Sequence, residues 1–141
     1  KVAYAHHPYI SNGIHGNAGN YDGLSFLPRW SGKDYREWLE YNICGKVDVF
    51  FAGHDHDLQL LHSIPECGNT IFVISGAGAK TRSLDAGETR NPYWNQVGDT
   101  LGFFIADMQG NTLKLRMYTV SQDDGQASLR YTRSFQRRQL D

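Results

Sequence analysis

The feature that most constrains this 141-residue chain is a pair of histidines placed directly after an apolar run. Residues 47–52 are almost continuously apolar, as in a strand buried on both faces of a parallel sheet. The run ends at Gly53, and His54 and His56 follow. Ligands of open α/β sheets bind beyond the carboxyl ends of strands, and imidazole is a common metal ligand, so the pattern predicts a metal site at the rim of a sheet. Asp55, between the histidines, is expected to orient one of them from outside the metal shell.

The same pattern occurs at the start of the chain. Residues 1–5 again resemble a short strand, and His6 and His7 follow, before Pro8. One isolated His-x-His pair would be equally well explained as a solvated loop. Two strand-like runs that each end in histidine favour side chains that converge on one rim, because parallel strands present their carboxyl ends at the same edge of the sheet.

Four stretches in order along the chain carry a family resemblance. They are Ala5-His6-His7-Pro8, Ile14-His15-Gly16, Gly53-His54-Asp55-His56-Asp57-Leu58-Gln59 and Ile74-Ser75-Gly76-Ala77-Gly78. In this order and at this spacing they resemble the C-terminal half of a calcineurin-like metallophosphoesterase, and specifically of a purple acid phosphatase. The resemblance begins at the first residue and becomes looser in the last part of the chain.

The resemblance implies an α/β fold, the rear half of a metallophosphoesterase-type double-sheet sandwich. It would have mixed β-strands, one main helix and a C-terminal antiparallel meander. Residues 1–141 would form the C-terminal part of a single domain whose N-terminal half is absent, and that half would be the partner on which the fold depends. Alone, the chain is expected to expose apolar surface and a bare strand edge.

The resemblance also implies roles for the histidines. His6 and His54 would ligate one metal of a dinuclear centre and His56 the other. His15 would be catalytic, touching the substrate phosphate or protonating the leaving alkoxide. The two ions would be iron with zinc, manganese or iron, completed by ligands outside this chain. His7 stands where the nearest phosphatases often have tyrosine, and the motifs of the family's N-terminal half are absent.

The function implied by the resemblance is metal-dependent hydrolysis of a phosphate ester, of the acid phosphatase type that acts on phosphomonoesters. Two alternatives remain open. One is a mononuclear zinc enzyme with His6, His54 and His56 around a single ion and one open position. The other is a non-catalytic metallophosphoesterase-like binding module. A secreted, periplasmic or lysosomal-type compartment follows only from the family resemblance.

Charge and hydropathy exclude other classes of function. The formal net charge is -1, which provides no basic field for nucleic acid and no polybasic membrane signal. No apolar run is long enough to predict a membrane span. The chain begins with Lys1 and has no signal peptide, which together with the missing motifs leads us to expect a fragment.

The periodicity of the remaining chain predicts its elements. Helical spacing predicts a helix over residues 32–44, which would begin with a capping box at Ser31 and pack Trp38 and Leu39 on the sheet. The Gly- and Asn-rich stretch 11–30 is predicted to be a substrate-side loop. The other predicted elements are strands 47–52, 58–62, 70–74, 101–107, 112–120 and 128–135, with an irregular segment over residues 80–100. A strand, loop, helix, strand order makes the first two strands parallel.

Four features outside the histidine motifs have simple structural interpretations. The spacing of Cys44 and Cys67 does not imply a disulfide, and the favoured interpretation is a buried cysteine at a helix end and a second one in a turn. His62 is expected to be a surface strand residue without a partner. The small residues 76–78 are expected to let the backbone pass close to the metal site. Trp94 would either line a substrate pocket or pack on the sheet.

Overall fold

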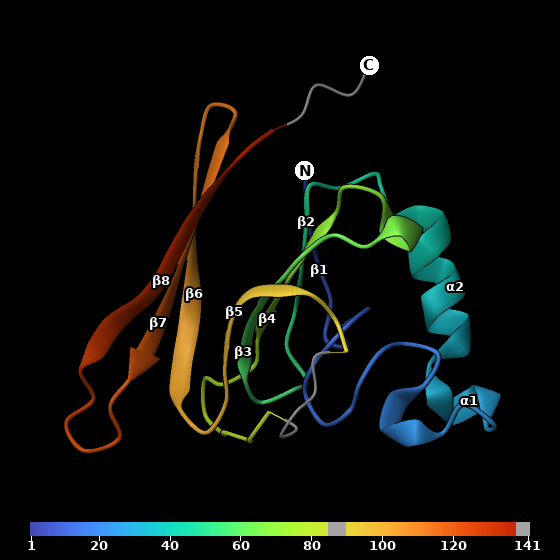
Figure 1. The fold of residues 1–141 in the computed structure, drawn as a ribbon, viewed down its shortest axis with the longest axis horizontal. Helices are drawn as coiled ribbons and strands as arrows, with labels where there is room; N and C mark the ends of the chain where they lie inside the picture. Colours follow the sequence, from blue (N-terminus) through green and yellow to red (C-terminus); the bar gives the residue numbers. More distant parts are fainter. Residues whose placement is uncertain (85–89, 138–141) are drawn as a thin grey trace.

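The structure is a computed structural model, and it describes residues 1–84 and 90–137. Strands carry most of the regular structure in these two ranges (Figure 1). The elements follow in the order β1 (Val2–Tyr4), η1 (Tyr21–Gly23), α1 (Pro28–Ser31), α2 (Lys33–Asn42), β2 (Val49–Ala52), β3 (Leu58–Leu61), η2 (Pro65–Cys67), β4 (Ile71–Ser75), β5 (Tyr93–Val97), β6 (Leu101–Gln109), β7 (Thr112–Val120) and β8 (Ala127–Gln136).

The first sheet is mixed, with its strands in the order β1-β2-β4-β3-β5. β1, β2 and β4 are parallel, which confirms the predicted parallel pairing of the first two strands, and β3 runs antiparallel to both β4 and β5. The pairing of β1 with β2 continues past the strand ends. Ala5 N donates to Phe51 O at 2.9 Å, and Gly53 N donates to His6 O at 3.1 Å. These bonds place the residues after both strands side by side.

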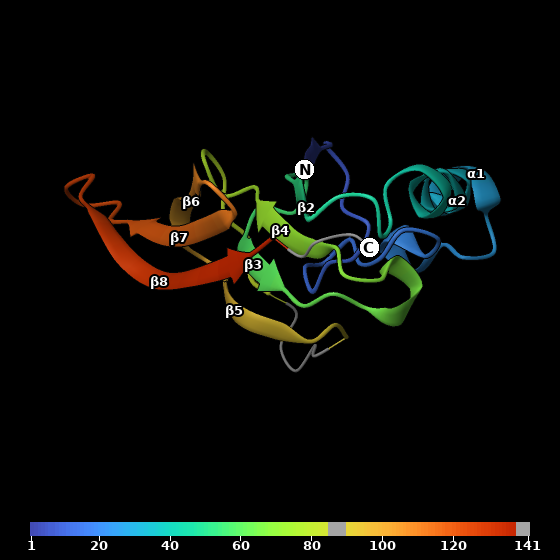
Figure 2. The ribbon, with the colours of Figure 1, turned by 90° about the horizontal axis from the view of Figure 1, so that it is seen from above.

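The two faces of this sheet are covered by different layers (Figures 1 and 2). Phe50 and Ala52 of β2 pack with Leu39 of α2 on one face, while Val49 and Phe51 pack with residues of the second sheet on the other. The alternation follows from the two-residue period of a strand, and it explains why β2 is apolar at every position. Burial of each such large side chain stabilises the fold by about 1.5–3 kcal/mol.

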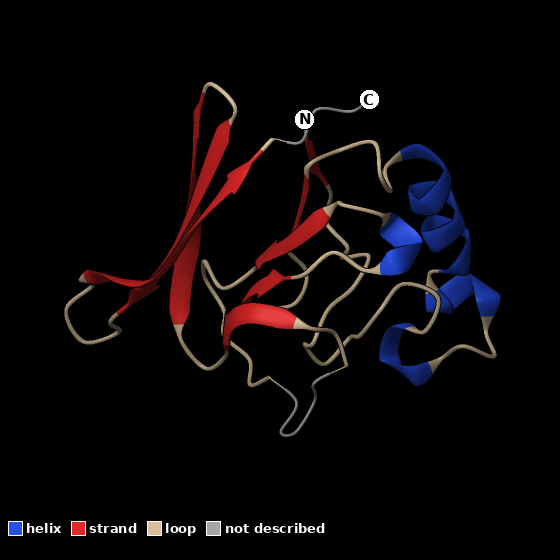
Figure 3. Cartoon of the chain, turned by 45° about the horizontal axis from the view of Figure 1, so that its top comes forward, coloured by secondary structure: helices blue, strands red, loops and turns tan. Residues whose placement is uncertain are grey.

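The second sheet is an antiparallel meander in the order β6-β7-β8, drawn at the left in Figure 3. It confirms the predicted C-terminal meander. Leu115 and Met117, which alternate along β7, are buried toward the first sheet. The described chain is therefore an α/β structure with a mixed sheet and an antiparallel sheet packed against each other, and with helices over the outer face of the mixed sheet.

The predicted irregular segment over residues 80–100 is wrong in part, because Tyr93–Val97 forms the edge strand β5. The sequence around Asn95 and Gln96 lacks the apolar alternation that identifies a strand, because this edge strand packs polar side chains inward. Gln96 Oε1, for example, accepts from Asn12 Nδ2 at 2.9 Å. His62 is also not without a partner. Its ring stacks on Trp94 with 4.0 Å between centroids, so Trp94 packs on the sheet.

The preferred reading of the cysteines is also wrong, because Cys44 and Cys67 form a disulfide. The C-terminal end of α2 and the turn η2 bring the two Cα atoms to 4.2 Å, a tertiary proximity that their separation of 23 residues does not reveal. The helix itself begins at Lys33 without a side-chain cap, so the predicted capping box is not formed.

The predicted burial of Trp38 is wrong as well. Leu39 is buried against the sheet, but the neighbouring position on the helix turns away, and Trp38 is 55% exposed. Adjacent helix positions point about 100° apart, and the stripe of α2 that faces the sheet includes Leu39 but not Trp38. Within the described ranges, no helix combines the length and apolar character needed to cross a membrane.

Candidate metal centre

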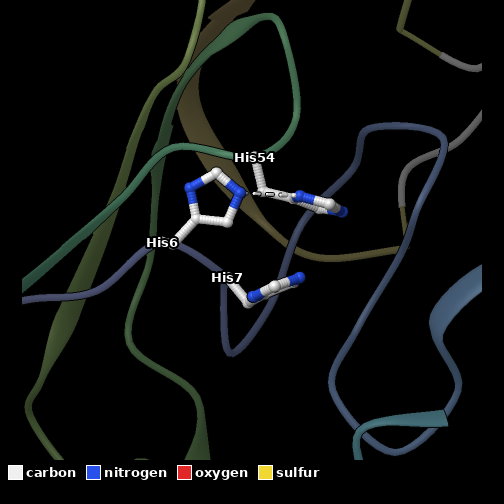
Figure 4. Close-up of side chains that lie close together, drawn as sticks. All are labelled: His6, His7 and His54. Atoms are coloured by element: carbon white, nitrogen blue, oxygen red, sulfur yellow. Dashed lines mark hydrogen bonds between the residues drawn. The ribbon is translucent and has the colours of Figure 1, made fainter. Parts of the chain in front are cut away.

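Three imidazoles meet where β1 and β2 end (Figure 4). His6 and His7 follow β1, and His54 follows β2. One ring nitrogen from each residue lies within 4.8 Å of the others, and His54 Nδ1 lies 3.1 Å from His6 Nε2. The side chains converge because the backbone pairing of the two strands extends to His6 and Gly53. This convergence of nitrogen donors is the arrangement expected of a metal site.

The backbone around His54 has an unusual geometry. His54 has a φ of 57°, in the left-handed region that few residues with a Cβ adopt. The turn also lies against the chain after β4, where a Cβ on Gly76 would come within 1.8 Å of Asp55 O. The small residue at position 76 therefore lets the backbone pass close to the histidine turn, as predicted. Strained backbone of this kind is concentrated at functional sites.

The electrostatics of the cluster favour the neutral form of two of its rings, those of His54 and His7. Burial, with the neighbouring His7, His15 and His6, lowers the pKa of His54 to about 4. Burial and His6 also lower the pKa of His7. Neutral imidazole is the form that binds a metal ion, so the fold favours the metal-binding state of these side chains.

His15 lies beside the cluster, with its ring 4.4 Å from that of His54 between centroids. Arg82 Nη1 donates to His15 Nε2 at 2.8 Å. Because arginine only donates, His15 Nε2 accepts, and Nδ1 carries the hydrogen that is donated to Asp22 Oδ1 at 2.6 Å. Both ring nitrogens are thus engaged, and the orientation of His15 is fixed.

His56 lies outside the group of three. Its Nδ1 is buried and has no hydrogen-bond partner among the described residues. A buried polar atom of this kind calls for an explanation, and a role as a metal ligand is one. The structure therefore brings His6 and His54 together, adds His7, and leaves His56 apart with an unsatisfied nitrogen.

Asp55 is buried and faces the loop that carries His15. Its carboxylate accepts from Ser11 Oγ and, at 3.3 Å, from the backbone N of His15. His15 Nε2 is 4.0 Å from Asp55 Oδ1. The carboxylate forms no hydrogen bond with the rings of His54 or His56 within the described chain, so the imidazole it can influence most directly is that of His15.

A buried polar network joins this loop to the rest of the site. Gln59 Nε2 donates to Ser11 Oγ at 3.0 Å and to Asp57 Oδ1 at 2.8 Å. Asn91 Nδ2 donates to Ser11 O at 3.0 Å and to Asn17 Oδ1 at 2.8 Å. These bonds hold the His15 loop against β3 and the segment before β5, and a fully satisfied buried network of this kind rigidifies a structure.

The metal-binding capacity follows from the donors. The group of three contains only nitrogen ligands, which suit zinc, copper, iron or nickel. The family resemblance gave His7 no role, and sequence reasoning did not assign Asp22 or Arg82 to the site. The adjacency of His7 to His6 was a signal for the first of these, whereas no local pattern distinguishes Asp22 or Arg82 from other charged loop residues.

Comparisons with known proteins give a distant likeness. No protein-family profile matches the chain, and no curated protein matches it in sequence. Among solved structures, a single mutant of Vps29 from Entamoeba histolytica is 20% identical, with a TM-score of 0.43 over 76% of this chain and 47% of that chain. A double mutant of the same protein is 18% identical, with a TM-score of 0.43 over 85% and 54%.

A third structure, wild-type Vps29 from the same organism complexed with Zn²⁺, is 19% identical, with a TM-score of 0.39 over 77% of this chain and 46% of that chain. The chain therefore spans about half the length of the structures it matches. Vps29 has a calcineurin-like metallophosphoesterase fold, and the likeness to it is a distant structural resemblance. The likeness is one of backbone fold alone and does not extend to the chemistry of the site.

Proposed function

We propose that this chain carries the histidine-rich part of a metal-dependent phosphoester hydrolase, most specifically an acid phosphatase-type phosphomonoesterase. The observation that carries the proposal is the convergence of His6, His7 and His54 within 4.8 Å, beside His15. Metal ions bound there would polarise the phosphoryl group and supply an ionised water. The histidine motifs and their spacing add the family resemblance described above.

In this proposal His6 and His54 hold one ion, and His56 contributes to a second. The orphaned Nδ1 of His56 supports the second assignment. The remaining ligands come from the N-terminal half of the same domain, outside this chain, and iron with zinc, manganese or iron is the expected pair. His7 becomes either a further ligand of the first ion or a hydrogen-bond donor to a group bound there.

His15 is the proposed catalytic residue. Its Nδ1–H is held by Asp22, so the ring keeps a fixed orientation next to the metal ligands. A histidine that carries a proton on Nε2 can deliver it to the leaving alkoxide, which typically accelerates a reaction about 10²–10⁴-fold. For His15 this step requires Nε2 to exchange the hydrogen bond from Arg82 for a proton. The buried Asp55 carboxylate lies 4.0 Å from Nε2 of this ring.

The test combines metal binding with activity in the full-length protein. His54→Ala should abolish phosphatase activity. It should also weaken zinc binding, measured by calorimetric titration, by more than about 10–100-fold, which is the usual effect of removing a residue that only hydrogen-bonds to a metal ligand. His62→Ala is the matched control, because this histidine stacks on Trp94 away from the cluster, and it should retain both properties. Full activity of the His54 variant would overturn the proposal.

A mononuclear site is the second candidate, favoured by the fact that three imidazoles from this chain alone form one group. Its ligands would be His6, His7 and His54 in place of the set with His56. It predicts one ion per chain and activity without any additional domain half. Elemental analysis decides between them, since the dinuclear proposal requires two ions per complete domain.

The compartment is also a proposal. The disulfide between Cys44 and Cys67 supports a secreted, periplasmic or lysosomal-type location, because disulfides persist mainly in oxidising environments. Mass analysis of protein purified from its native source under alkylating conditions would show a disulfide if this is right, and two alkylated cysteines if it is not.

A further inference from the structure

Arg82 is held beside the histidine cluster by backbone bonds on both sides. Its N donates to His56 O at 2.9 Å, and its O accepts from Asp99 N at 2.9 Å. The chain near Gly98 passes so closely that a Cβ there would lie 2.7 Å from Arg82 O and 2.6 Å from Leu84 N. Asp99 itself has a φ of 55°. The position of Arg82 is therefore determined by the fold.

The guanidinium of Arg82 points toward the candidate site. Its Nη1 donates to His15 Nε2 at 2.8 Å, and the ring of His15 lies against that of His54. Among the described residues, no carboxylate forms an ion pair with Arg82. Its side-chain contact is the acceptor Nε2 of His15, so a permanent positive charge stands near the metal ligands and is not paired with a carboxylate of the described residues.

We propose that Arg82 binds the non-bridging oxygens of the substrate's phosphoryl group and makes the site selective for dianionic phosphomonoesters. This inference rests on the proposed function for the identity of the substrate. A guanidinium offers five donors in a planar fork that matches a phosphate, and it is always charged. Only one of its donors is engaged by His15, so the others can meet an anion seated on the metal.

The selectivity follows from charge. A phosphomonoester carries about -1.5 to -2 charges near neutral pH, whereas a diester carries one. A guanidinium next to the metal ions favours the more highly charged ester, and a second ester group would occupy the oxygen that Arg82 would otherwise bind. Arg82 is thus a substrate-binding residue, distinct from the histidines that hold the metal.

The experiment measures binding of inorganic phosphate to the zinc-loaded full-length protein by calorimetry. Hydrogen bonds to charged groups contribute about 1.5–3 kcal/mol, so Arg82→Ala should weaken phosphate about 10–100-fold. Arg82→Lys should recover part of the loss, because it keeps the charge but not the fork. The zinc content should stay that of the wild type in both. Arg130→Ala, which removes an exposed cation from β8, is the matched control and should bind phosphate normally.

Gly98→Ala gives a second route to the same result. The added methyl group would displace the 82–84 segment while every charged residue is retained. Phosphate binding should weaken as in Arg82→Ala, with zinc still bound. In kinetic assays, Arg82→Ala should lower kcat/KM for a phosphomonoester far more than for a diester.

The outcomes separate this inference from the proposed function. If the wild type binds phosphate and hydrolyses esters, and Arg82→Ala binds phosphate as tightly as the wild type, the role of Arg82 is overturned and the hydrolase proposal stands. If Arg82→Ala weakens phosphate but the wild type hydrolyses no ester, the anion site stands and the hydrolase proposal fails. Equal losses for monoester and diester in Arg82→Ala would overturn the selectivity.

Discussion

Two ionisable side chains in and beside the histidine turn respond to pH in opposite directions. The pKa of His54 is lowered to about 4, so this side chain is neutral in the folded protein near neutral pH. Protonation of His54 at acid pH destabilises the folded state. The pKa of Asp57 is raised to about 7, chiefly by burial and also by the nearby Asp55. The two carboxylates pack directly against Gly13. A Cβ at position 13 would lie 2.6 Å from both Asp55 Cγ and Asp57 Oδ2, so only glycine fits there without a shift.

The effect of Asp57 can be isolated with Asp57→Asn in metal-free protein. Its folded-state pKa of about 7 lies above the ordinary 3.8, so its favourable contribution is complete below the ordinary value and is lost as pH rises through about 7. At about pH 8 the amide, which carries no charge, should therefore raise the free energy of unfolding by on the order of 2 kcal/mol, since one pKa unit equals about 1.4 kcal/mol.

The gain from Asp57→Asn should fall progressively as the pH is lowered from about 7, and it should approach zero only below about pH 3.8, where Asp57 is protonated in both the folded and the unfolded chain. Urea unfolding of both proteins in the presence of a chelator, repeated across this pH range, gives the difference directly. Asp123→Asn, at an exposed position, should change stability by less than about 0.5 kcal/mol at every pH. A pH-independent difference for Asp57→Asn would contradict the assignment.

Among the elements, apolar patterning predicted the strands whose side chains are buried in the hydrophobic core. β2, β4 and the meander are apolar or alternating, and their ranges differ from the predicted ones by a few residues at most. β5 was missed because its inward side chains serve a polar network, which has no periodic signature. Trp38 was misplaced because periodicity defines a face but not its centre.

The candidate site likewise contains residues that a local sequence pattern predicted and residues that it did not. The positions of the histidines after two strands predicted that they converge, and the fold brings His6, His7 and His54 together. The ligand set of His6, His54 and His56 was implied by the family resemblance. Arg82 and Asp22 reach His15 only through the folded loops, so their contacts are tertiary and leave no local pattern. The disulfide is of the same kind, because it depends on where α2 and η2 end in space.

That disulfide ties the helical layer to the turn before β4, and its removal is the clearest test at this scale. Cys44→Ala with Cys67→Ala should lower the free energy of unfolding by about 2–4 kcal/mol, because the loop between them becomes free in the unfolded chain. Zinc binding should be unchanged when the protein is folded, since the cluster is built on β1 and β2. Thermal unfolding with and without a reductant provides the measurement, and a wild type insensitive to reduction would contradict the prediction.

Over the whole molecule, the two sheets leave an open groove of about 460 Å³ between their edges. Tyr4 and Phe51 line it from the first sheet, and Phe104 and Ala106 line it from the second. β1 pairs only with β2 among the described strands, so its other edge is unpaired. An unpaired strand beside apolar side chains is a site where further chain can add, as expected if a second half of the domain belongs there.

The edge of β1 should therefore drive self-association of the isolated chain, and Tyr4→Lys should suppress it. Tyr4 is 75% exposed and stacks on Phe51 at 5.2 Å between ring centroids. A lysine there keeps the strand but places a charge at the edge, which natural sheets use against edge-to-edge pairing. The lost ring contact should cost no more than about 1.5 kcal/mol of stability.

Sedimentation velocity over a concentration series measures the effect of Tyr4→Lys. The control is Tyr41→Lys on α2, because Tyr41 is 77% exposed but lies on the helix, away from the groove. The wild type and the control should form larger species as concentration rises, while Tyr4→Lys stays monomeric. If all three behave alike, the association does not use the β1 edge. If only Tyr4→Lys is monomeric, the β1 edge is the surface through which the chain associates, as expected if a further part of the domain covers it.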